Sequence, residues 1–566
     1  MSRAPRTPAS GPDSGDWRAG DRLVALTGVA PSCGRRISGV LALAALAALA
    51  GCGGDSGAEG NGGGKPSAPA GPPPNVLVIT LDTLRADRVG CYGGARATTP
   101  HLDAFAAEGV RFEQAFAASS FTPPTHASIL TGRYPAEHGL LHWNKHLGPV
   151  PTAAALFAAA GYRTGAFTPM PTLLLLGLDR GFSEQQSPPY HQEGQQIVLA
   201  DADAVNAAAL PWLTAPAAAT GGKPFFAWVH YYDAHRPYGR QGQQWSGRFT
   251  AHDDTSVGRT EEWYQLAPDD RERLALDEAK VALIEDHYDG GLAYLDDRVG
   301  ALLDGLRAAG VLEHTLVVIL ADHGEVFDEH EPEWFSHDPY LFDENVHIPF
   351  LLRFPDGRDA GRQIGALVSQ VDVLPTLLAF AGLAPPAGGL SGFDLLPLID
   401  GGRPPRELVF ADRIGDDLAD RKGEPPTEDE IKASRDRQFM VRSATRKLVV
   451  CKDRGGSEAL FATGAPGGER TDLLSAPGLA AAEGAAHAAL KKAFGHWYST
   501  LVMAGAGGAP APGLDADEQD FLRTLGYVGG SESAPAPAPT PEPKQAKAAP
   551  HDARAAPHEQ PPATRE

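Results

Sequence analysis

The stretch Asn75–Asp82, NVLVITLD, is the first of three segments that decide the fold. It is a continuous apolar run, rich in Val and Ile, that ends in a carboxylate. The stretch Thr315–Glu325, TLVVILADHGE, repeats this pattern and ends in Asp322-His323. Short runs of this kind are typical of strands buried on both faces of a parallel sheet. We therefore predict an open α/β sheet with these polar residues at the carboxyl ends of its strands, where such sheets bind ligands.

The third segment, Phe121–Pro135, FTPPTHASILTGRYP, places a hydroxyl at the start of a helix. Thr122 precedes Pro123-Pro124, and proline suits the first turn of a helix because its missing N–H would be unpaired there anyway. We expect Thr122 at or near the N-cap, where unpaired backbone N–H groups and the positive helix end stabilise an alkoxide and a bound oxyanion. Taken alone, these residues also fit an ordinary helix start.

Together the three segments predict a metal-assisted site. Asp82, Asp322 and His323 would project into one crevice, where two carboxylates and an imidazole hold a divalent ion. The ion would lower the pKa of the Thr122 hydroxyl, itself expected among the ligands, and neutralise a transferred oxyanion. A histidine ligand admits Zn or Mn beside the harder ions Ca and Mg. The prediction is one divalent ion, with its identity left open.

Composition narrows the class of partner. The 566 residues carry a formal net charge of −22, and the sequence pI is about 5.3. No basic stripe offsets this charge, which argues against nucleic acid as a partner. The length allows two domains and a large core. The four cysteines do not form a disulfide framework, and Cys91 and Cys451 would pair only if the fold brought them within reach.

The N-terminal residues 1–52 are typical of a secretory signal. Arg35-Arg36 precede an apolar run, and the ending LAGC resembles a bacterial lipobox with Cys52 as its lipidated residue. The run of about 14 apolar residues is shorter than the roughly 20 that a spanning helix needs. We therefore expect a lipoprotein of the bacterial cell envelope, anchored to the membrane through Cys52 and facing the periplasm or the cell exterior.

Two further segments have the composition of unfolded chain. Residues 53–74 are rich in Gly, Ser and Pro, as a flexible linker is. Residues 531–566 are rich in Pro and Ala and poor in aromatic residues, which predicts a disordered tail.

The three segments and five others resemble the sulfatase family of the alkaline-phosphatase superfamily. The matching stretches follow the family's order over about residues 74–400: NVLVITLDTLRADRVGCYG, TTPHLDAFAAEGVRFEQAFA, FTPPTHASILTGRYPAEHG, FFAWVHYYDAHRPY, YDGGLAYLDDRVGALLDGL, TLVVILADHGE, FSHDPYLFDENVHIPFLL and VSQVDVLPTLLAFAGL. The resemblance implies an alkaline-phosphatase-like, mostly parallel sheet flanked by helices in a catalytic domain at 75–405. It also implies a smaller C-terminal α+β subdomain at 406–530.

The resemblance implies catalytic roles for two histidines. His235 falls in the H-x-P segment whose histidine contacts the sulfate or the leaving group, with Asp233 either orienting it or lying near the metal. His337 stands where the family carries a lysine or histidine that donates to the transferred group, and an imidazole there would protonate the leaving oxygen. The alternative for both is an ordinary loop histidine.

A third histidine, His126, stands where sulfatases carry an arginine beside the nucleophile. An imidazole there would hydrogen-bond the oxyanion or Thr122, less rigidly than a guanidinium. Glu325 and His347 are interpreted as structural.

The chain departs from the family pattern at three places. Thr122 replaces the Cys or Ser that sulfatases oxidise to formylglycine, and the secondary β-carbon of threonine cannot become an aldehyde. Thr83 stands where sulfatases repeat an aspartate, and a lysine-histidine pair is replaced around Gly165–Pro171. An unmodified threonine instead resembles the nucleophile of superfamily phosphotransferases and phosphodiesterases, which form a phospho-threonine.

Three functional hypotheses follow. The first is a metal-dependent hydrolase of sulfuric or related esters that uses Thr122 directly. The second is a phosphodiesterase or phosphotransferase on the same scaffold. The third is a non-catalytic relic that binds glycans or lipids. The substrate of either enzyme would be a small-molecule, glycan or lipid ester of sulfate or phosphate.

Overall fold

The computed structural model describes residues 73–499, except 194–195, 251–277, 328, 331–334, 336, 338–339, 414–437, 452–456, 465–467 and 476–477. The predicted signal with Cys52, the linker up to residue 72 and the tail lie outside the described residues, so those predictions and the domain boundaries remain predictions. Within the described ranges, no helix is both long and apolar enough to cross a membrane.

The main sheet has nine strands, most of them parallel. Its order is β11-β2-β10-β8-β1-β7-β3-β4, and β9 pairs with β2. Strand β10 is antiparallel to both of its neighbours, whereas β1 is parallel to β7 and β8. The strands are β1 (Asn75–Leu81), β2 (Val110–Phe116), β3 (Arg163–Phe167), β4 (Glu184–Gln186), β7 (Phe225–Tyr231), β8 (Thr315–Ala321), β9 (His347–Ile348), β10 (Phe350–Arg353) and β11 (Arg362–Ser369).

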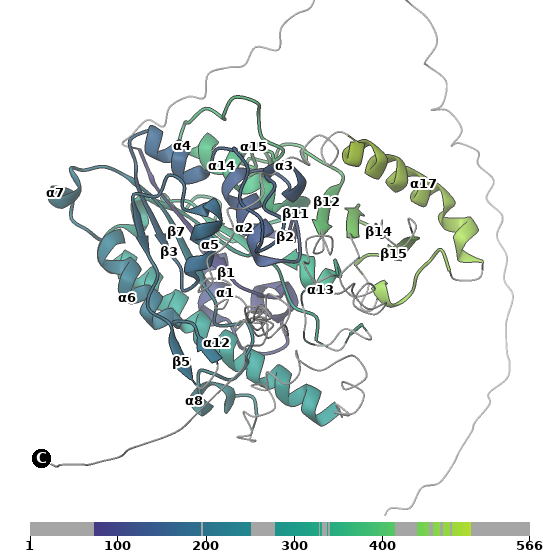
Figure 1. Cartoon of the computed structure of the whole chain (residues 1–566), viewed down its shortest axis with the longest axis horizontal. Helices are drawn as coiled ribbons and strands as arrows, with labels where there is room; N and C mark the ends of the chain where they lie inside the picture. The colour runs from purple at the N-terminus through teal and green to yellow at the C-terminus, as the bar shows by residue number, and fades with distance from the viewer. Residues whose placement is uncertain are drawn as a thin grey trace, which may run out of the picture. The chain divides into compact units, whose positions relative to one another are not determined.

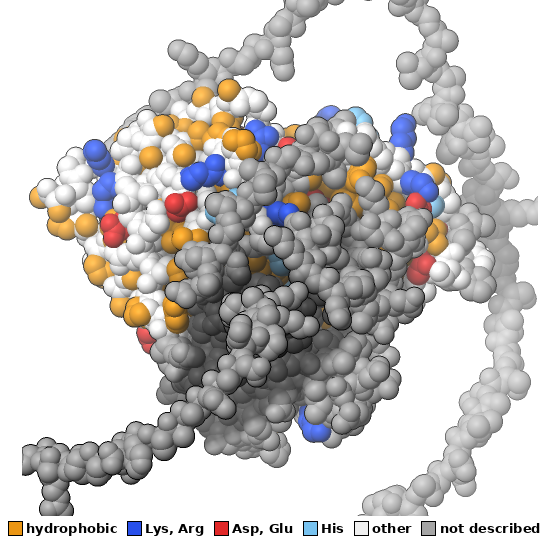
Figure 2. All heavy atoms as spheres, in the orientation of Figure 1, with side chains coloured by type: hydrophobic (Ala, Val, Ile, Leu, Met, Phe, Trp, Pro, Cys, Tyr) orange, Lys and Arg blue, Asp and Glu red, His pale blue; other side chains and the backbone are white. Residues whose placement is uncertain are grey.

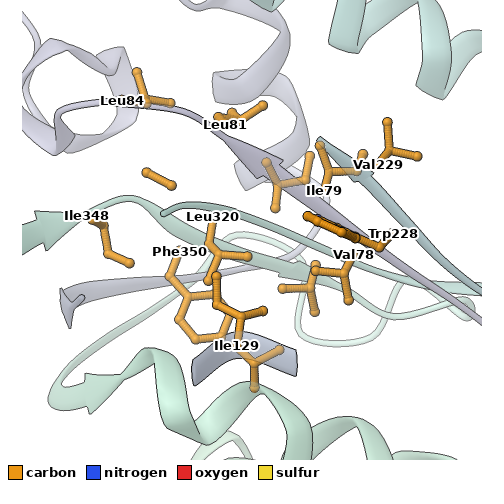
Figure 3. Close-up of a cluster of buried hydrophobic side chains, with 14 of the residues drawn as sticks. Val78, Ile79, Leu81, Leu84, Ile129, Trp228, Val229, Leu320, Ile348 and Phe350 are labelled. Carbon is orange, nitrogen blue, oxygen red and sulfur yellow. The ribbon is translucent and has the colours of Figure 1, made fainter. Parts of the chain in front are cut away.

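The central strands are buried on both faces, as their continuous apolar sequences predict. All seven residues of β7 and of β8 are buried. Figure 3 shows Val78 and Ile79 of β1 packed among side chains from β7 and β8, with Ile129 of a neighbouring helix below them. Because successive strand residues point to opposite faces, such runs require helices on both sides of the sheet.

Helices cover the two faces of the sheet (Figure 1). On one face, α6 packs on β7, β3 and α12, and α1 packs on α12, β2 and β10. On the other face, α4 packs on β3 and β7, and α2 packs on α4 and α14. These helices are α1 (Pro100–Ala107), α2 (Thr122–Thr131), α4 (Ala153–Ala159), α6 (Ala202–Leu213), α12 (Glu278–Ala308) and α14 (Val373–Phe380).

Short helices and a small hairpin complete the connections around the sheet. The helices are α3 (Pro135–His138), α5 (Pro171–Leu173), α7 (Ala217–Thr220), α8 (Gln243–Ser246), α13 (Asp343–Val346) and α15 (Leu396–Ile399), and the hairpin joins β5 (His191–Glu193) to β6 (Gln196–Val198). His347, interpreted as structural, has its Nε2 2.9 Å from the carbonyl of Glu113 on β2. It thereby fastens the short strand β9 to the sheet.

A separate antiparallel sheet follows in the chain. Its order is β12-β13-β14-β15, with strands β12 (Val409–Arg413), β13 (Gln438–Arg442), β14 (Arg446–Cys451) and β15 (Ser457–Ala462). Helix α17 (Leu479–Trp497) packs on β13 and β14. The predicted fold class, a mostly parallel α/β sheet with a smaller α+β part, is confirmed. Cys91 and Cys451 do not form a disulfide with each other in this fold.

Parallel pairing brings three strand ends to one edge of the main sheet. Leu81, the last residue of β1, pairs with Ala321 of β8 and with Tyr231 of β7. The residues that follow these strands therefore start at the same level.

On the described part of the face in Figure 2, acidic and basic side chains are scattered rather than gathered in one patch.

Candidate active site

Four predicted metal ligands meet at this edge of the sheet. Asp82 follows β1, Asp322 and His323 follow β8, and Thr122 begins α2. Asp82, Asp322 and His323 each offer one donor atom, and these atoms lie within 4.8 Å of one another. The Oγ1 of Thr122 lies 3.1 Å from the Nε2 of His323. All four side chains are fully buried, so the three distant segments converge as the sequence predicted.

Backbone groups orient Asp322. Its Oδ1 accepts hydrogen bonds from the backbone amides of Thr83 at 3.1 Å and His323 at 2.7 Å. Thr83 has a φ of 51°, a left-handed conformation that a β-branched residue seldom adopts. This conformation turns the Thr83 amide toward the carboxylate. One oxygen of Asp322 is thereby fixed, and the other is left for a ligand.

The two carboxylates leave buried oxygens without hydrogen bonds. Both oxygens of Asp82 and the Oδ2 of Asp322 have no hydrogen-bond partner among the described residues. Burial raises the pKa of Asp82 to about 8, although the nearby His337 opposes this rise. Burial and the charge of Asp82 raise the pKa of Asp322 well above its usual range. A divalent cation would satisfy these oxygens, and carboxylate and imidazole donors suit Zn or Mn as well as harder ions. The donor set therefore fits a divalent metal ion.

His323 presents an unprotonated nitrogen to Thr122. The Nδ1 of His323 lies 2.9 Å from the carbonyl of Gly324, which only accepts, so Nδ1 carries the hydrogen. Burial lowers the pKa of His323 well below its usual value, so the ring is neutral and Nε2 is bare. This nitrogen is able to accept the hydrogen of the Thr122 hydroxyl or to bind a cation, but not both at once.

The start of α2 differs from the prediction in one respect. Thr122 is its first residue and Phe121 its N-cap, so the hydroxyl lies near the cap as expected. However, Pro123 and Pro124 carry no N–H, and the N–H of Thr125 donates to the carbonyl of Phe121 at 3.2 Å. The expectation of several unpaired N–H groups around the hydroxyl is therefore wrong. The amide of Thr122 and the helix dipole remain at this helix end.

His126 contacts the backbone of Thr122 and not its hydroxyl. The Nδ1 of His126 lies 2.8 Å from the Thr122 carbonyl oxygen, and its Nε2 lies 3.1 Å from the Oγ1 of Thr80. Both ring nitrogens thus have protein partners, so the predicted hydrogen bond to the Thr122 hydroxyl or an oxyanion is not seen. The geometry makes His126 a residue that positions the first turn of α2.

His337 contacts the carboxylate of Glu325, a residue that the sequence analysis interprets as structural. The Nδ1 of His337 lies 3.0 Å from the Oε1 of Glu325, and Oε2 accepts a hydrogen bond from the hydroxyl of Tyr238 at 2.9 Å. All three side chains are buried. The rings of His337 and His323 lie 4.6 Å apart between centroids. Glu325 therefore belongs to the site, and its position two residues after His323 was the signal for it.

His235 lies beside His337, with ring centroids 5.2 Å apart. Its Nδ1 lies 2.7 Å from the carbonyl of Arg236. Asp233 faces elsewhere, with its Oδ1 3.4 Å from the Nη2 of Arg240, and burial raises the pKa of Asp233 to about 6 although Arg240 opposes this. The structure brings His235 to the site. It does not show Asp233 orienting His235, and Asp233 is not a member of the ligand group defined above.

Gln370, which the sequence gave no reason to select, ties the two sides of the site together. Its Oε1 accepts a hydrogen bond from the amide of Ala118, which lies just before the α2 segment, at 3.0 Å. Its Nε2 donates to the carbonyls of Ala321, at 3.0 Å, and Asp322. One buried amide side chain thus connects the segment that leads to Thr122 with the loop that carries Asp322.

A mostly parallel sheet that gathers a hydroxyl, paired carboxylates and a carboxylate-held imidazole at its carboxyl edge is typical of hydrolases that cleave sulfuric or phosphoric esters. The chain belongs to the sulfatase family, since the family model described as Sulfatase matches residues 74–383, more than half of its length. It is therefore a sulfatase-like ester hydrolase. This family lies within the alkaline-phosphatase-like superfamily.

Over the aligned segments, about a quarter of the residues are identical between the chain and two of its relatives. It is 26% identical over 355 residues to the ulvan-active sulfatase of Formosa agariphila, covering 58% of this chain and 65% of that relative. It is 28% identical over 398 residues to human arylsulfatase A, covering 60% of this chain and 70% of that protein.

Solved structures share the fold at lower sequence identity. The phosphonate monoester hydrolase of Agrobacterium radiobacter aligns with a TM-score of 0.61 and 22% identity, covering 75% of this chain and 96% of that one. A structure solved with its substrate D-glucosamine-2-N,6-O-disulfate aligns with a TM-score of 0.59 and 20% identity, covering 78% and 99% of the two chains.

Proposed function

We propose that the chain hydrolyses sulfuric esters with the unmodified Thr122 hydroxyl as its nucleophile. The observation that carries this proposal is the 3.1 Å approach of the Thr122 Oγ1 to His323 Nε2, beside two carboxylates whose oxygens lack hydrogen bonds. Nucleophilic catalysis by a hydroxyl needs an adjacent base or cation, and this position offers either.

Asp82, Asp322 and His323 would hold one divalent ion, with the Thr122 hydroxyl beside it. When bound, the ion would supply positive charge that lowers the pKa of the hydroxyl and neutralises the transferred group. The family and the fit of the donor set support this metal dependence.

The chemistry divides among the chain's own residues. The Thr122 hydroxyl gives up its proton to solvent and its oxygen attacks the sulfur of the ester, so that a bond from Oγ1 to sulfur forms while the bond from sulfur to the leaving oxygen breaks. His337 gives a proton from Nε2 to that leaving oxygen, and Glu325 holds the ring through Nδ1. His235 contacts the sulfate oxygens from the other side of His337. Water then attacks the sulfur of the threonyl sulfate, and the bond from sulfur to Oγ1 breaks. Thr122 regains its hydroxyl hydrogen from that water, hydrogen sulfate leaves, and His337 takes up a proton from solvent.

The substrate class follows from the relatives, which include an ulvan-active sulfatase and arylsulfatase A. We propose a small-molecule, glycan or lipid sulfate ester, reached from a membrane anchor on Cys52.

A second candidate, a phosphodiesterase or phosphotransferase, is favoured by one specific feature. Thr122 cannot be converted to an aldehyde, whereas a phospho-threonine is readily released by attack of water or an alcohol at phosphorus.

One experiment separates the two candidates. The full-length chain is assayed with 4-nitrophenyl sulfate, 4-nitrophenyl phosphate and bis(4-nitrophenyl) phosphate in the presence of Mn, Zn, Ca or Mg. We expect sulfate turnover, retained in part by Thr122→Ser and abolished by Thr122→Val, which keeps the shape but lacks the hydroxyl. Trapping of ³²P but not ³⁵S on Thr122 would support the phosphoryl candidate. Full activity of Thr122→Val would overturn both.

A further inference from the structure

The turn that follows β1 contains a strained residue. Thr83 has a φ of 51°, in the left-handed region that β-branched residues avoid because of steric repulsion. Such a conformation persists only where the surrounding structure holds it in place. The side chain of Thr83 is fully buried, and its hydroxyl has no hydrogen-bond partner among the described residues. The conformation is therefore held through the backbone of the turn and not through a hydrogen bond of its own side chain.

A distant tyrosine holds this backbone. The hydroxyl of Tyr288, on α12, donates a hydrogen bond to the carbonyl of Thr83 at 2.8 Å. The same hydroxyl accepts a hydrogen bond from the amide of Arg85 at 3.2 Å. Tyr288 is fully buried, so both hydrogen bonds are made within the protein. One phenolic oxygen thus binds both ends of the short segment from residue 83 to residue 85.

The ring of Tyr288 is itself fixed by packing. Its edge meets the ring of Phe327, with centroids 5.0 Å apart and an interplanar angle of 71°. It also meets the ring of Tyr238, at 5.8 Å and 77°. The helix that carries Tyr288, α12, packs on α1, α6 and α8. The position of the hydroxyl is therefore set by the core of the protein, because close-packed side chains do not shift easily.

The conformation of Thr83 affects the orientation of Asp322. In the left-handed conformation, the amide of Thr83 donates to the Oδ1 of Asp322 at 3.1 Å. The other oxygen of Asp322, Oδ2, has no hydrogen-bond partner among the described residues and lies 3.4 Å from the Nε2 of His323. With Thr83 in an extended conformation, its amide would turn away from Asp322. The carboxylate would then keep only the hydrogen bond from the amide of His323.

We propose that Tyr288 is a positioning residue, whose hydroxyl holds Thr83 in the left-handed conformation and thereby keeps Asp322 in the orientation that binds the divalent ion. The inference rests on the proposed function in taking the ion to lie at Asp82, Asp322 and His323. Hydrogen bonds to a ligating carboxylate set its orientation, and their loss weakens metal binding. Tyr288 acts on the affinity for the ion through the backbone of Thr83.

Metal affinity measures this effect. The full-length chain and its Tyr288→Phe variant, which keeps the ring and removes the hydroxyl, are titrated with Zn²⁺ in competition with a chelator. We expect the variant to bind Zn²⁺ about 10-fold more weakly than the wild type.

Tyr294→Phe is the matched control. Tyr294 is a buried tyrosine of the same helix, and its hydroxyl contacts the amide of Asp203 at 3.3 Å and the Oδ2 of that residue at 3.2 Å. Tyr294→Phe should bind Zn²⁺ as tightly as the wild type does. Equal Zn²⁺ affinity of Tyr288→Phe and Tyr294→Phe would overturn the proposal.

A substitution of Thr83 tests whether Tyr288 acts through the backbone conformation. Glycine adopts positive φ as readily as negative φ, so a chain with Thr83→Gly does not need the tyrosine hydroxyl to hold the turn. We expect Tyr288→Phe to weaken Zn²⁺ binding only about 2-fold or less when it is combined with Thr83→Gly. Loosening of the core alone would not be rescued in this way. An equal loss of affinity with threonine and with glycine at position 83 would overturn the proposal.

The same variants distinguish a failure of this inference from a failure of the proposed function. If the wild type binds Zn²⁺ and Thr122→Val keeps full activity, the proposed function fails and the inference stands. If Thr122→Val is inactive and Tyr288→Phe binds Zn²⁺ as the wild type does, the inference fails and the proposed function stands. A wild-type chain that binds no Zn²⁺ would overturn both.

Discussion

The Nδ1 of His337 lies 3.0 Å from the Oε1 of Glu325, and both side chains are buried at the carboxyl edge of the sheet. A carboxylate only accepts hydrogen bonds, so Nδ1 donates and Nε2 is the nitrogen left for the reacting groups. Glu325 is therefore arranged to support His337 as a proton donor.

Removing the charge of Glu325 should slow the reaction most when the leaving group is poor. We expect Glu325→Gln to lower kcat about 10- to 100-fold with an alkyl sulfate, because the leaving alkoxide needs a proton. With 4-nitrophenyl sulfate, whose leaving group needs little protonation, the loss should be smaller. Steady-state kinetics with a series of leaving groups measures this difference.

Tyr238→Phe is the matched control for this prediction, because it removes the 2.9 Å hydrogen bond to Glu325 and keeps the carboxylate. Its effect on kcat should be a few-fold and should show the same dependence on the leaving group. An equal loss in Glu325→Gln across all leaving groups would mean that Glu325 does not act through proton transfer.

Removing metal should make the stability of the protein fall as the pH rises. Burial raises the pKa of Asp82 from 3.8 to about 8, so the folded state binds a proton that the unfolded state has released between these pH values. The contribution of Asp82 to the free energy of unfolding is therefore fully present below about pH 4, and it is lost as the pH rises through 8. We expect the Tm of the EDTA-treated chain to fall between pH 5 and 8, and Zn²⁺ or Mn²⁺ to restore it.

Asp82→Asn separates this effect from other buried acids such as Asp412, whose pKa burial also raises to about 8. The variant should show a shallower fall of Tm with pH and a weaker response to metal. A variant that follows the wild-type pH curve would rule out Asp82 as the source.

A buried ion cluster joins the antiparallel sheet to α13. Lys447 Nζ lies 3.1 Å from Asp343 Oδ1 and 2.5 Å from Glu469 Oε1, and the lysine side chain is fully buried. We expect Lys447→Met to lower the free energy of unfolding by about 3–5 kcal/mol, because it leaves the buried Glu469 without its cation, while Arg442 still pairs with Asp343 at 2.6 Å. Urea unfolding measures this loss.

Arg446→Met is the control on the neighbouring residue of β14. Arg446 pairs with Glu483 at 2.7 Å, but this pair is open to solvent and therefore screened. Arg446→Met should lower the free energy of unfolding much less than Lys447→Met does. Equal losses would show that the buried cluster contributes no more than a surface pair.

The lipid anchor is tested at Cys52. In a bacterial host that processes lipoproteins, the full-length chain should be found in the membrane fraction and incorporate labelled palmitate. Cys52→Ala should abolish the label. Unchanged labelling of the variant would disprove lipidation at this residue.

Local sequence patterns predicted the strands and the ligand group well. Apolar runs identified β1 and β8, and parallel pairing then brought Asp82 and Asp322 together. The same patterns gave no reason to place His230 Nε2 3.4 Å from Asp82 Oδ2, because His230 lies inside the apolar run of β7. They missed Gln370 because its three hydrogen bonds are made across the fold.

The helix α2 was predicted correctly, but the hydrogen-bond donors expected at its start were not. The helix begins where predicted, but Pro123 and Pro124 remove the backbone donors that a helix start usually offers. Under the proposed function, side chains from other segments, such as His235 and His337, contact the transferred group instead.

Gln370 bonds both the segment before α2 and the loop that carries Asp322. A single planar amide has a fixed length, so the spacing between hydroxyl and carboxylate is set before any substrate arrives. The spacing between Thr122 and Asp322 is thus built into the folded chain by a side chain outside the ligand group, and an inhibitor would have to fit that spacing as it stands.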